Sequence, residues 1–387
     1  MNLMNLFNRA NISFVYGKGA RLYDNKSIEY IDFSSGIGVC SLGHSYKKLI
    51  SAIQNQAKNI IHSSNLYHIK TQEKLAKLIS DTLGYKTYAF FCNSGCEANE
   101  CAIKYARKYG YVKFKKHKFE ILTLSNSFHG RTLATLKANG QDKFHPDCFA
   151  PYPEGFKFFD SIDEIIKNIS ENTIGVMIEL VQGEGGIKAL DKSEVQRLAK
   201  VLKEKNLLLI TDEVQCGMYR TGEFVTSKHY GIKPDVITFA KGLAGGVPIG
   251  ACVVREDIFE LGDHGSTFGG NFLATSAGLC VLKELNKLKK SSKLDHTISD
   301  FNDGLSIFVS KYPKIFKEKT GLGLMLGLKV NNGIDFSKIY DLCIKNKLLV
   351  LKSGKDTLRF LPPLNINKKE MEEGFKRFKK ALDEYEI

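Results

Sequence analysis

Two charged residues that end apolar runs have the types needed for covalent chemistry. Lys241 directly follows the apolar run 236–240 and is itself followed by a glycine-rich turn. Burial of a lysine amine disfavours its charged form, and the neutral nitrogen is the better nucleophile. Asp212 follows the apolar run 207–210 at a distance of one residue. Open α/β sheets bind ligands at the carboxyl ends of their strands, so we expect Lys241 and Asp212 in one site.

An amine and a fixed carboxylate are the groups that pyridoxal 5'-phosphate (PLP) needs from a protein. The amine forms the Schiff base, and the carboxylate pairs with the ring nitrogen. In an extended chain Asp212 and Val214 would project to the same side, which would place Val214 beneath the ring. Gln215 could then hydrogen-bond to the ring hydroxyl. A lone aspartate at a strand end is more often a turn or helix cap, so this interpretation depends on Lys241.

A phosphate site is predicted where a strand meets a helix, in the segment N-S-G-C-E-A-N-E at 93–100. Gly95 permits close approach of the backbone, and from Cys96 onward the free amides of a helix N-terminus favour an anion. The alternative is plain helix capping by Ser94, and the two are about equally good without Lys241. The loop 264–271, H-G-S-T-F-G-G-N, also offers hydroxyls and glycines to phosphate oxygens.

The segment S-F-H-G-R at 127–131 has residues suited to a planar cofactor and a carboxylate. Phe128 could lie flat on an aromatic ring, and Arg131 could bind a carboxylate through two parallel hydrogen bonds. His129 taken alone is more often structural than catalytic. Further along, glycines at the end of another apolar run leave Glu184 on a rim.

The elements that must position these residues alternate along the chain. Strands are predicted at 88–91, 120–124, 174–180, 207–210, 236–240 and 251–254, with helices at 97–108, 162–168 and 192–205. Such alternation favours a mostly parallel sheet with helices on both faces. Outside this region we predict helices at 46–59, 72–82 and 272–305, strands at 324–330, 348–352 and 357–361, and a terminal helix from 368.

The fold expected is therefore α/β, with a large domain built on that sheet and a smaller α+β domain. We place the large domain at 56–280 and build the smaller one from both termini, 1–55 and 281–387.

Composition excludes several classes of protein. The 387 residues are 43% hydrophobic and 25% charged, as in ordinary globular proteins. No apolar stretch reaches the roughly 20 residues of a membrane span, and no secretory signal or transit peptide is apparent, which points to the cytosol. The nine cysteines are odd in number and form no C-x-x-C pair. We expect reduced thiols and no metal site.

The net charge of +14 suggests nucleic-acid binding as an alternative function. Its best local support is the segment 108–119, where lysines alternate with aromatic residues. The lysines are spread over the whole chain, however, so we favour a solvated basic surface that attracts anionic metabolites, with no nucleic acid bound.

Taken together, six motifs resemble those of a known family, in the same order and at similar spacing. They are NSGCEANE, SFHGR, QGEGG, TDEVQ, TFAKGLAGGVPIGA and HGSTFGGN. The chain resembles the class III PLP-dependent aminotransferases of fold type I, and within them is most similar to the acetylornithine aminotransferases. Cys40, Cys96, Leu180 and Thr320 depart from the usual pattern.

This resemblance implies a role for each matching residue. Lys241 would carry the cofactor and shuttle a proton, with Asp212 and Gln215 at the ring, Phe128 stacked on it, and Gly95 and Cys96 at the phosphate. In a homodimer, Thr267 would contact the phosphate of the other subunit's cofactor. Arg131 and Ser266 would bind the acylated donor. Glu184 would pair with Arg359. The implied substrates are N-acetylornithine, 2-oxoglutarate and glutamate, in arginine biosynthesis, with succinyl-diaminopimelate as a possible second donor.

Two alternatives stay open from the sequence. One keeps the cofactor and changes the donor, as in ornithine or 4-aminobutyrate transaminases or a semialdehyde aminomutase. The other is a nucleic-acid-binding protein on an inactive enzyme fold.

Overall fold

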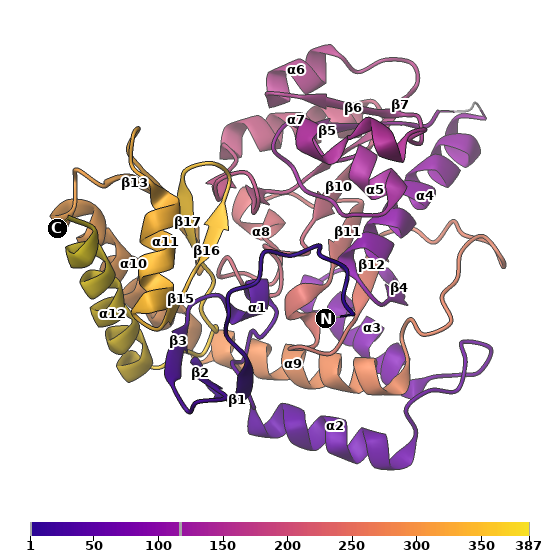
Figure 1. The fold of residues 1–387 in the computed structure, drawn as a ribbon. Helices are drawn as coiled ribbons and strands as arrows, with labels where there is room; N and C mark the ends of the chain where they lie inside the picture. Colours follow the sequence, from indigo (N-terminus) through magenta and orange to yellow (C-terminus); the bar gives the residue numbers. More distant parts are fainter. Residues whose placement is uncertain (1, 116–117, 387) are drawn as a thin grey trace.

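A central sheet of seven strands organises the molecule (Figure 1). The computed structural model describes residues 2–115 and 118–386. The strands lie in the order β4-β12-β11-β10-β7-β5-β6, where β12 runs antiparallel to both neighbours and the remaining pairs are parallel. Their bounds are β4 Tyr88–Cys92, β5 Glu120–Leu124, β6 Phe156–Phe159, β7 Thr173–Ile178, β10 Leu208–Asp212, β11 Val236–Phe239 and β12 Gly250–Val254. The expected mostly parallel sheet is confirmed.

Helices cover both faces of this sheet. The long helix α4 (Gly95–Phe114) packs on β11 and β12. On the other face α6 (Ile162–Lys167) packs on β5 and β6, and α7 (Lys192–Glu204) packs on β10. Strands β7, β10, β11 and β12 are buried throughout, because both of their faces are covered. This accounts for their continuous apolar runs.

Three further helices flank the β4 edge. The helix α9 (Phe272–Lys290) packs against α2 (Lys47–Asn59) and α3 (Lys70–Leu83). The predicted helical stretch beyond residue 290 is divided, because Ser292 adopts a left-handed φ of 58° that an α-helix cannot continue through. The chain resumes as α10 (Lys293–Lys311).

The smaller unit combines both ends of the chain, as expected. β15 pairs in parallel with β3, which joins the N-terminal strands to C-terminal residues. Figure 1 shows the indigo β1–β3 beside the yellow elements of the C-terminal part. The bounds are β1 Phe14–Lys18, β2 Arg21–Asp24, β3 Glu29–Asp32, β13 Phe316–Leu322, β14 Met325–Val330, β15 Leu348–Leu349, β16 Leu351–Ser353, β17 Thr357–Phe360, α11 Phe336–Lys345 and α12 Lys368–Glu386.

Short elements occupy the loops around the sheet. They are α1 Ser35–Gly38, α5 Leu133–Lys137, α8 Ser227–Tyr230, β8 Val181–Gln182, β9 Lys188–Ala189, and the 3-10 turns η1 Asp142–Phe144, η2 Asp147–Phe149 and η3 Lys241–Leu243. The domain boundaries at 55/56 and 280/281 stay predictions, and each falls inside a helix, α2 or α9. In the described part of the chain, no helix has the length and apolar character to cross a membrane.

Candidate active site

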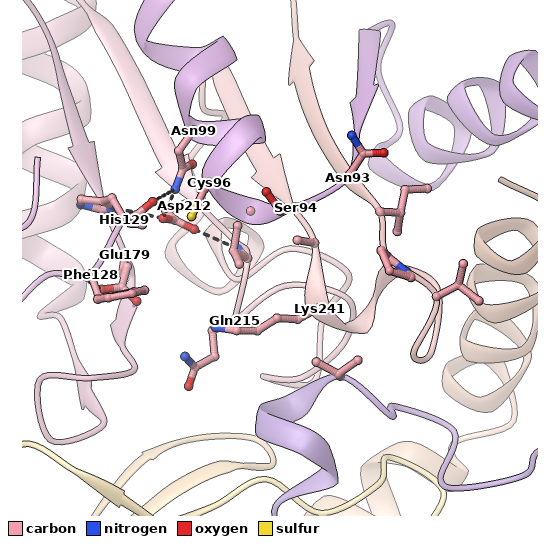
Figure 2. A pocket seen from close by; sticks show the side chains of 18 of the residues that line it. Asn93, Ser94, Cys96, Asn99, Phe128, His129, Glu179, Asp212, Gln215 and Lys241 are labelled. Atoms are coloured by element: carbon pink, nitrogen blue, oxygen red, sulfur yellow. Dashed lines mark hydrogen bonds and ion pairs between the residues drawn. The ribbon is translucent and has the colours of Figure 1, made fainter. Parts of the chain in front are cut away.

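A pocket of about 280 Å³ opens where β7, β10 and β11 end and α4 begins (Figure 2). It brings together seven of the predicted cofactor-contacting residues, which come from four separate stretches of sequence. They are Gly95, Cys96, Phe128, Asp212, Val214, Gln215 and Lys241. The eighth, Thr267, does not line it and is exposed.

The carboxylate of Asp212 is held by three hydrogen bonds at the end of β10. Its Oδ2 accepts from Nδ2 of Asn99 at 2.8 Å and from Nδ1 of His129 at 2.9 Å. Its Oδ1 accepts from the backbone N–H of Val214 at 3.0 Å. Figure 2 shows this network among the side chains that line the pocket. With the side chain only 3% exposed, the carboxylate has a fixed direction.

The chain after Asp212 is a turn, which corrects one expectation. Strand β10 ends at Asp212 and a turn begins at Val214, so the strand does not extend to Val214 as the alternation argument assumed. Val214 nevertheless lines the pocket, because the turn folds it against Gly95. A Cβ at position 95 would lie 2.8 Å from Cγ1 of Val214, so only glycine fits there.

Lys241 begins the turn η3 directly after β11 and extends into the pocket. Its φ of 31° is unfavourable for a non-glycine residue, and such strain clusters at functional sites. Burial, and then the positive charge of Arg359, lower the pKa of the Lys241 amine. In the described part of the chain no carboxylate lies within 4 Å of its nitrogen. The amine is thus predisposed to the neutral, nucleophilic form.

At the start of α4, helix capping leaves the helix N-terminus facing the pocket. Oγ of Ser94 accepts from the backbone N–H of Glu97 at 3.2 Å, as the capping alternative predicted. The Glu97 carboxylate in turn accepts from the backbone N–H of Asn93 at 2.5 Å. Ser94, Gly95 and Cys96 still line the pocket, so the positive end of a 20-residue helix faces it.

Phe128 is fixed at its backbone by a buried carboxylate. Oε2 of Glu179 accepts from the N–H of Phe128 at 2.9 Å, and Oε1 accepts from the N–H of Gly183 at 3.3 Å. Burial, together with the nearby charge of Asp212, raises the pKa of Glu179. Glu179 therefore connects the loop that carries the aromatic ring to the loop that carries Glu184.

Arg359 on β17 reaches the pocket's rim from the smaller unit. Its Nη1 donates to Oε1 of Glu184 at 2.6 Å, to Oε1 of Gln215 at 3.0 Å and to the carbonyl of Gly183 at 2.9 Å. With its carbonyl oxygen accepting from Arg359, Gln215 has its NH2 group left as a donor.

Two predicted donor-binding residues lie outside the pocket itself. Arg131 is exposed, and its guanidinium carbon is 5.4 Å from the centroid of the Phe128 ring. Oγ of Ser266 accepts from the N–H of Gly269 at 2.9 Å and lies 3.3 Å from Nδ2 of Asn93, which lines the pocket. Both therefore lie close to pocket residues without lining it.

Sequence reasoning did not assign a site role to Asn99, His129 or Glu179. Asn99 follows Gly95 by one helical turn on α4, so it faces the same way, and this spacing was a usable signal. His129 was judged structural, and its contact with Asp212 joins residues 83 positions apart. Nothing local in the sequence indicates that pairing.

The mostly parallel sheet, with a lysine and an aspartate at its strand ends, defines a PLP-dependent transferase of fold type I. The family model Aminotransferase class-III matches residues 7–382, and the chain belongs to that family. It is 48% identical to the acetylornithine aminotransferase of Wolinella succinogenes, over 98% of this chain and 97% of the relative.

Two solved structures extend the comparison. The ornithine aminotransferase of Toxoplasma gondii superposes with a TM-score of 0.93 at 29% identity, covering 100% of this chain and 93% of that one. The N-acetylornithine aminotransferase of Stenotrophomonas maltophilia gives a TM-score of 0.83 at 31% identity, covering 98% and 97%. Class III aminotransferases are PLP-dependent, so this chain is a PLP-dependent aminotransferase.

The pocket fits PLP by its own chemistry. It offers a lysine amine without a carboxylate partner, a carboxylate fixed by three donors, and a helix N-terminus beside a glycine that tolerates no Cβ. These match the aldehyde, the ring nitrogen and the phosphate of the cofactor.

Proposed function

We propose that this aminotransferase moves the terminal amine of N-acetylornithine to 2-oxoglutarate and produces glutamate. The likeness to the Wolinella succinogenes enzyme over nearly the full length supports this donor. The observation that carries the proposal is the contrast between two arginines. Arg359 is paired with Glu184, whereas Arg131 is exposed with no carboxylate within 4 Å in the described part of the chain.

Lys241 and Asp212 would hold the two reactive parts of the cofactor. When bound, PLP supplies an electron sink for negative charge that develops on the substrate carbon. Asp212 would keep a proton on the ring nitrogen, which strengthens that sink. The Lys241 amine would carry the proton that moves between carbon atoms, as its lowered pKa favours.

The remaining pocket residues would orient the cofactor. Phe128 would stack on one face of the ring and Val214 would pack on the other, while the Gln215 NH2 group would donate to the ring hydroxyl. The backbone N–H groups at Gly95 and Cys96 would bind the phosphate, and the cysteine side chain does not alter that contact.

Arg131 and Ser266 would bind the amino-acid end of the donor. In N-acetylornithine the α-amine is acylated and uncharged, so only the α-carboxylate needs an ionic partner. An arginine without a competing carboxylate suits it, and no acidic group for an α-ammonium is required.

Glu184 and Arg359 would let one site accept both substrates. The reacting end of N-acetylornithine has no carboxylate, so Arg359 stays paired with Glu184. 2-Oxoglutarate places a carboxylate beside its reacting carbon, and Arg359 would bind it once Glu184 moves away. Such exchange avoids leaving a buried charge unpaired in either half of the reaction.

The quaternary and cellular assignments are part of the proposal. Thr267 is exposed and outside the pocket of its own chain, as a residue that serves a partner's phosphate in a homodimer would be. The cytosolic location and the domain boundaries rest on the sequence alone.

Initial rates with 2-oxoglutarate as acceptor test the donor. We expect N-acetylornithine to be preferred over ornithine and 4-aminobutyrate, with succinyl-diaminopimelate as a weaker donor. Arg131→Lys should raise the KM for N-acetylornithine about tenfold and change PLP affinity little, because lysine cannot make the bidentate contact. A strong preference for free ornithine would overturn the choice of donor.

The nucleic-acid alternative has weaker support. Residues 116 and 117 of its segment lie outside the described residues. Lys108 forms ion pairs with Glu260 and Asp263, each at 3.1 Å, at the surface of α4. Salt-sensitive binding of single-stranded nucleic acid, with no turnover of any amino donor, would restore this alternative.

A further inference from the structure

The guanidinium of Arg131 rests against aromatic rings. Its carbon lies 4.5 Å from the centroid of the Phe144 ring and 5.4 Å from that of Phe128. In the described residues no carboxylate is within 4 Å of it. A cation over an aromatic face is attracted by the ring quadrupole, and this contact uses none of the five N–H donors.

Phe144 is held in this place by two sets of contacts. Its ring packs edge-on against Phe128, with centroids 5.4 Å apart and an interplanar angle of 67°. The backbone of its turn is tied to the Phe128 loop, because Nε2 of Gln141 donates to the carbonyls of Asn126 and Ser127 at 3.3 and 3.2 Å. The N–H of Phe144 donates to the carbonyl of Gln141 at 3.0 Å.

We propose that Phe144 is a positioning residue that holds Arg131 ready for the α-carboxylate of the donor. The inference rests on the proposed function, in which Arg131 binds that carboxylate. A long, exposed arginine samples many rotamers, and each must be given up when substrate binds. An acidic partner would restrain Arg131 but would compete with the substrate. The Phe144 ring restrains it without such competition, and leaves the fork of N–H groups free.

A second role for Phe144 has to be separated from this one. Because the Phe144 ring also contacts Phe128, the alternative is that Phe144 merely supports the Phe128 ring, which would stack on the cofactor. That role would affect every amino donor equally and would weaken PLP binding. Positioning of Arg131 affects only donors that carry an α-carboxylate.

The test uses the holoenzyme and two donors that differ in that group alone. N-Acetylputrescine is N-acetylornithine without the α-carboxylate, so both place the same amine and acyl group in the site. We would measure kcat and KM for both donors, and PLP affinity by titration, in wild type, Phe144→Leu and Phe144→Tyr. Lys143→Gln is the matched control, since Nζ of Lys143 also lies over the Phe144 ring, at 5.0 Å.

For Phe144→Leu we expect the KM for N-acetylornithine to rise roughly three- to thirty-fold, as for loss of one cation–π contact, with kcat nearly unchanged. The kcat/KM for N-acetylputrescine and the PLP affinity should change less than about twofold. Phe144→Tyr keeps the ring and should behave as wild type, as should Lys143→Gln. If Phe144→Leu does not yield folded protein, Phe144→Met replaces it, because methionine keeps most of the volume.

Equal losses with both donors, or weakened PLP binding, would overturn the inference in favour of support for Phe128. An unchanged KM for N-acetylornithine in Phe144→Leu would overturn it as well. The Arg131→Lys variant distinguishes failure of the role of Phe144 from failure of the role of Arg131 in the proposed function. If that variant raises this KM and Phe144→Leu does not, only the role of Phe144 fails. If Arg131→Lys also leaves the KM unchanged, the assignment of Arg131 in the proposed function fails first.

Discussion

Nη1 of Arg359 and Oε1 of Glu184 lie 2.6 Å apart, and the two side chains differ sharply in exposure. The arginine side chain is 4% exposed and the glutamate side chain 31%. Glu184 is therefore the side chain that can turn toward solvent, whereas Arg359 is also held by its bonds to Gln215 and the carbonyl of Gly183. We therefore expect the glutamate to be the partner that moves.

This asymmetry predicts the effect of Glu184→Ala. With Arg359 permanently unpaired, the half-reaction with glutamate should be favoured over the half-reaction with N-acetylornithine by about tenfold, as for one partly exposed charge pair. Stopped-flow measurement of each half-reaction checks this. Glu223→Ala removes a carboxylate that pairs with Lys228 and Lys289, and serves as control. An unchanged ratio would show that Glu184 does not control access to Arg359.

The covalent role of Lys241 has a direct chemical test. Borohydride treatment of the holoenzyme should fix PLP to the peptide that contains Lys241, and Lys241→Ala should lose both the fixed cofactor and turnover. Lys319 is the matched control, because burial lowers its pKa too, yet its Nζ donates to Asn302 and Ser306 and lies outside the pocket. Mass spectrometry of the reduced, digested protein identifies the site. Label on Lys319, or on no lysine, would refute the assignment.

Local sequence patterns were enough to predict the site residues whose positions depend on the strand or helix they belong to. Asp212 ends one buried strand, Lys241 follows the end of another, and Gly95 opens a helix, so apolar runs and a glycine were sufficient. The turn that begins at residue 214 was missed because the approach of Val214 to Gly95 is a tertiary contact. Roles for Glu184 and Arg359 came from family resemblance, since no spacing relates residues 175 positions apart.

The smaller unit was predicted less completely for two different reasons. Strand β13 (Phe316–Leu322) lies at a sheet edge with partly exposed residues, so it has no apolar run or clear alternation. Helix α11 (Phe336–Lys345) did carry a signal, because Phe336, Ile339, Tyr340 and Cys343 recur at helical spacing. That element could have been found from the sequence.

His44 should make folding stability depend on pH. Burial of the ring opposes its protonation. The hydrogen bond to Asp32 at 2.8 Å, the interaction with Cys40 and the charge of Asp32 together outweigh burial and raise the pKa of His44 to about 9. The folded state thus binds the proton more tightly than the unfolded chain, whose histidine titrates near 6.5. The stabilisation is complete below pH 6.5 and is lost as pH rises through about 9.

Comparison of wild type with His44→Gln in urea at several pH values checks this. We expect wild type to be more stable by about 1–2 kcal/mol at pH 6.5, after allowance for solvent screening, and the difference to vanish above pH 9. His68→Gln is the control, because that side chain is 89% exposed beside Glu73 and such pairs contribute little. A difference that grows with pH would contradict the assigned sign.

The proposal that Thr267 of one subunit contributes to the site of the other can be tested by complementation. If each site takes Lys241 from one chain and Thr267 from the other, a hybrid of Lys241→Ala and Thr267→Ala subunits contains one intact site and one site with both defects. Co-expression with two affinity tags would isolate that hybrid, and we expect about half of the wild-type activity per dimer, since one of two sites is intact. If Thr267 served its own chain, the hybrid would contain two damaged sites and show no gain over the Thr267→Ala homodimer. The exposed position of Thr267, outside the pocket that Lys241 lines, favours the first outcome.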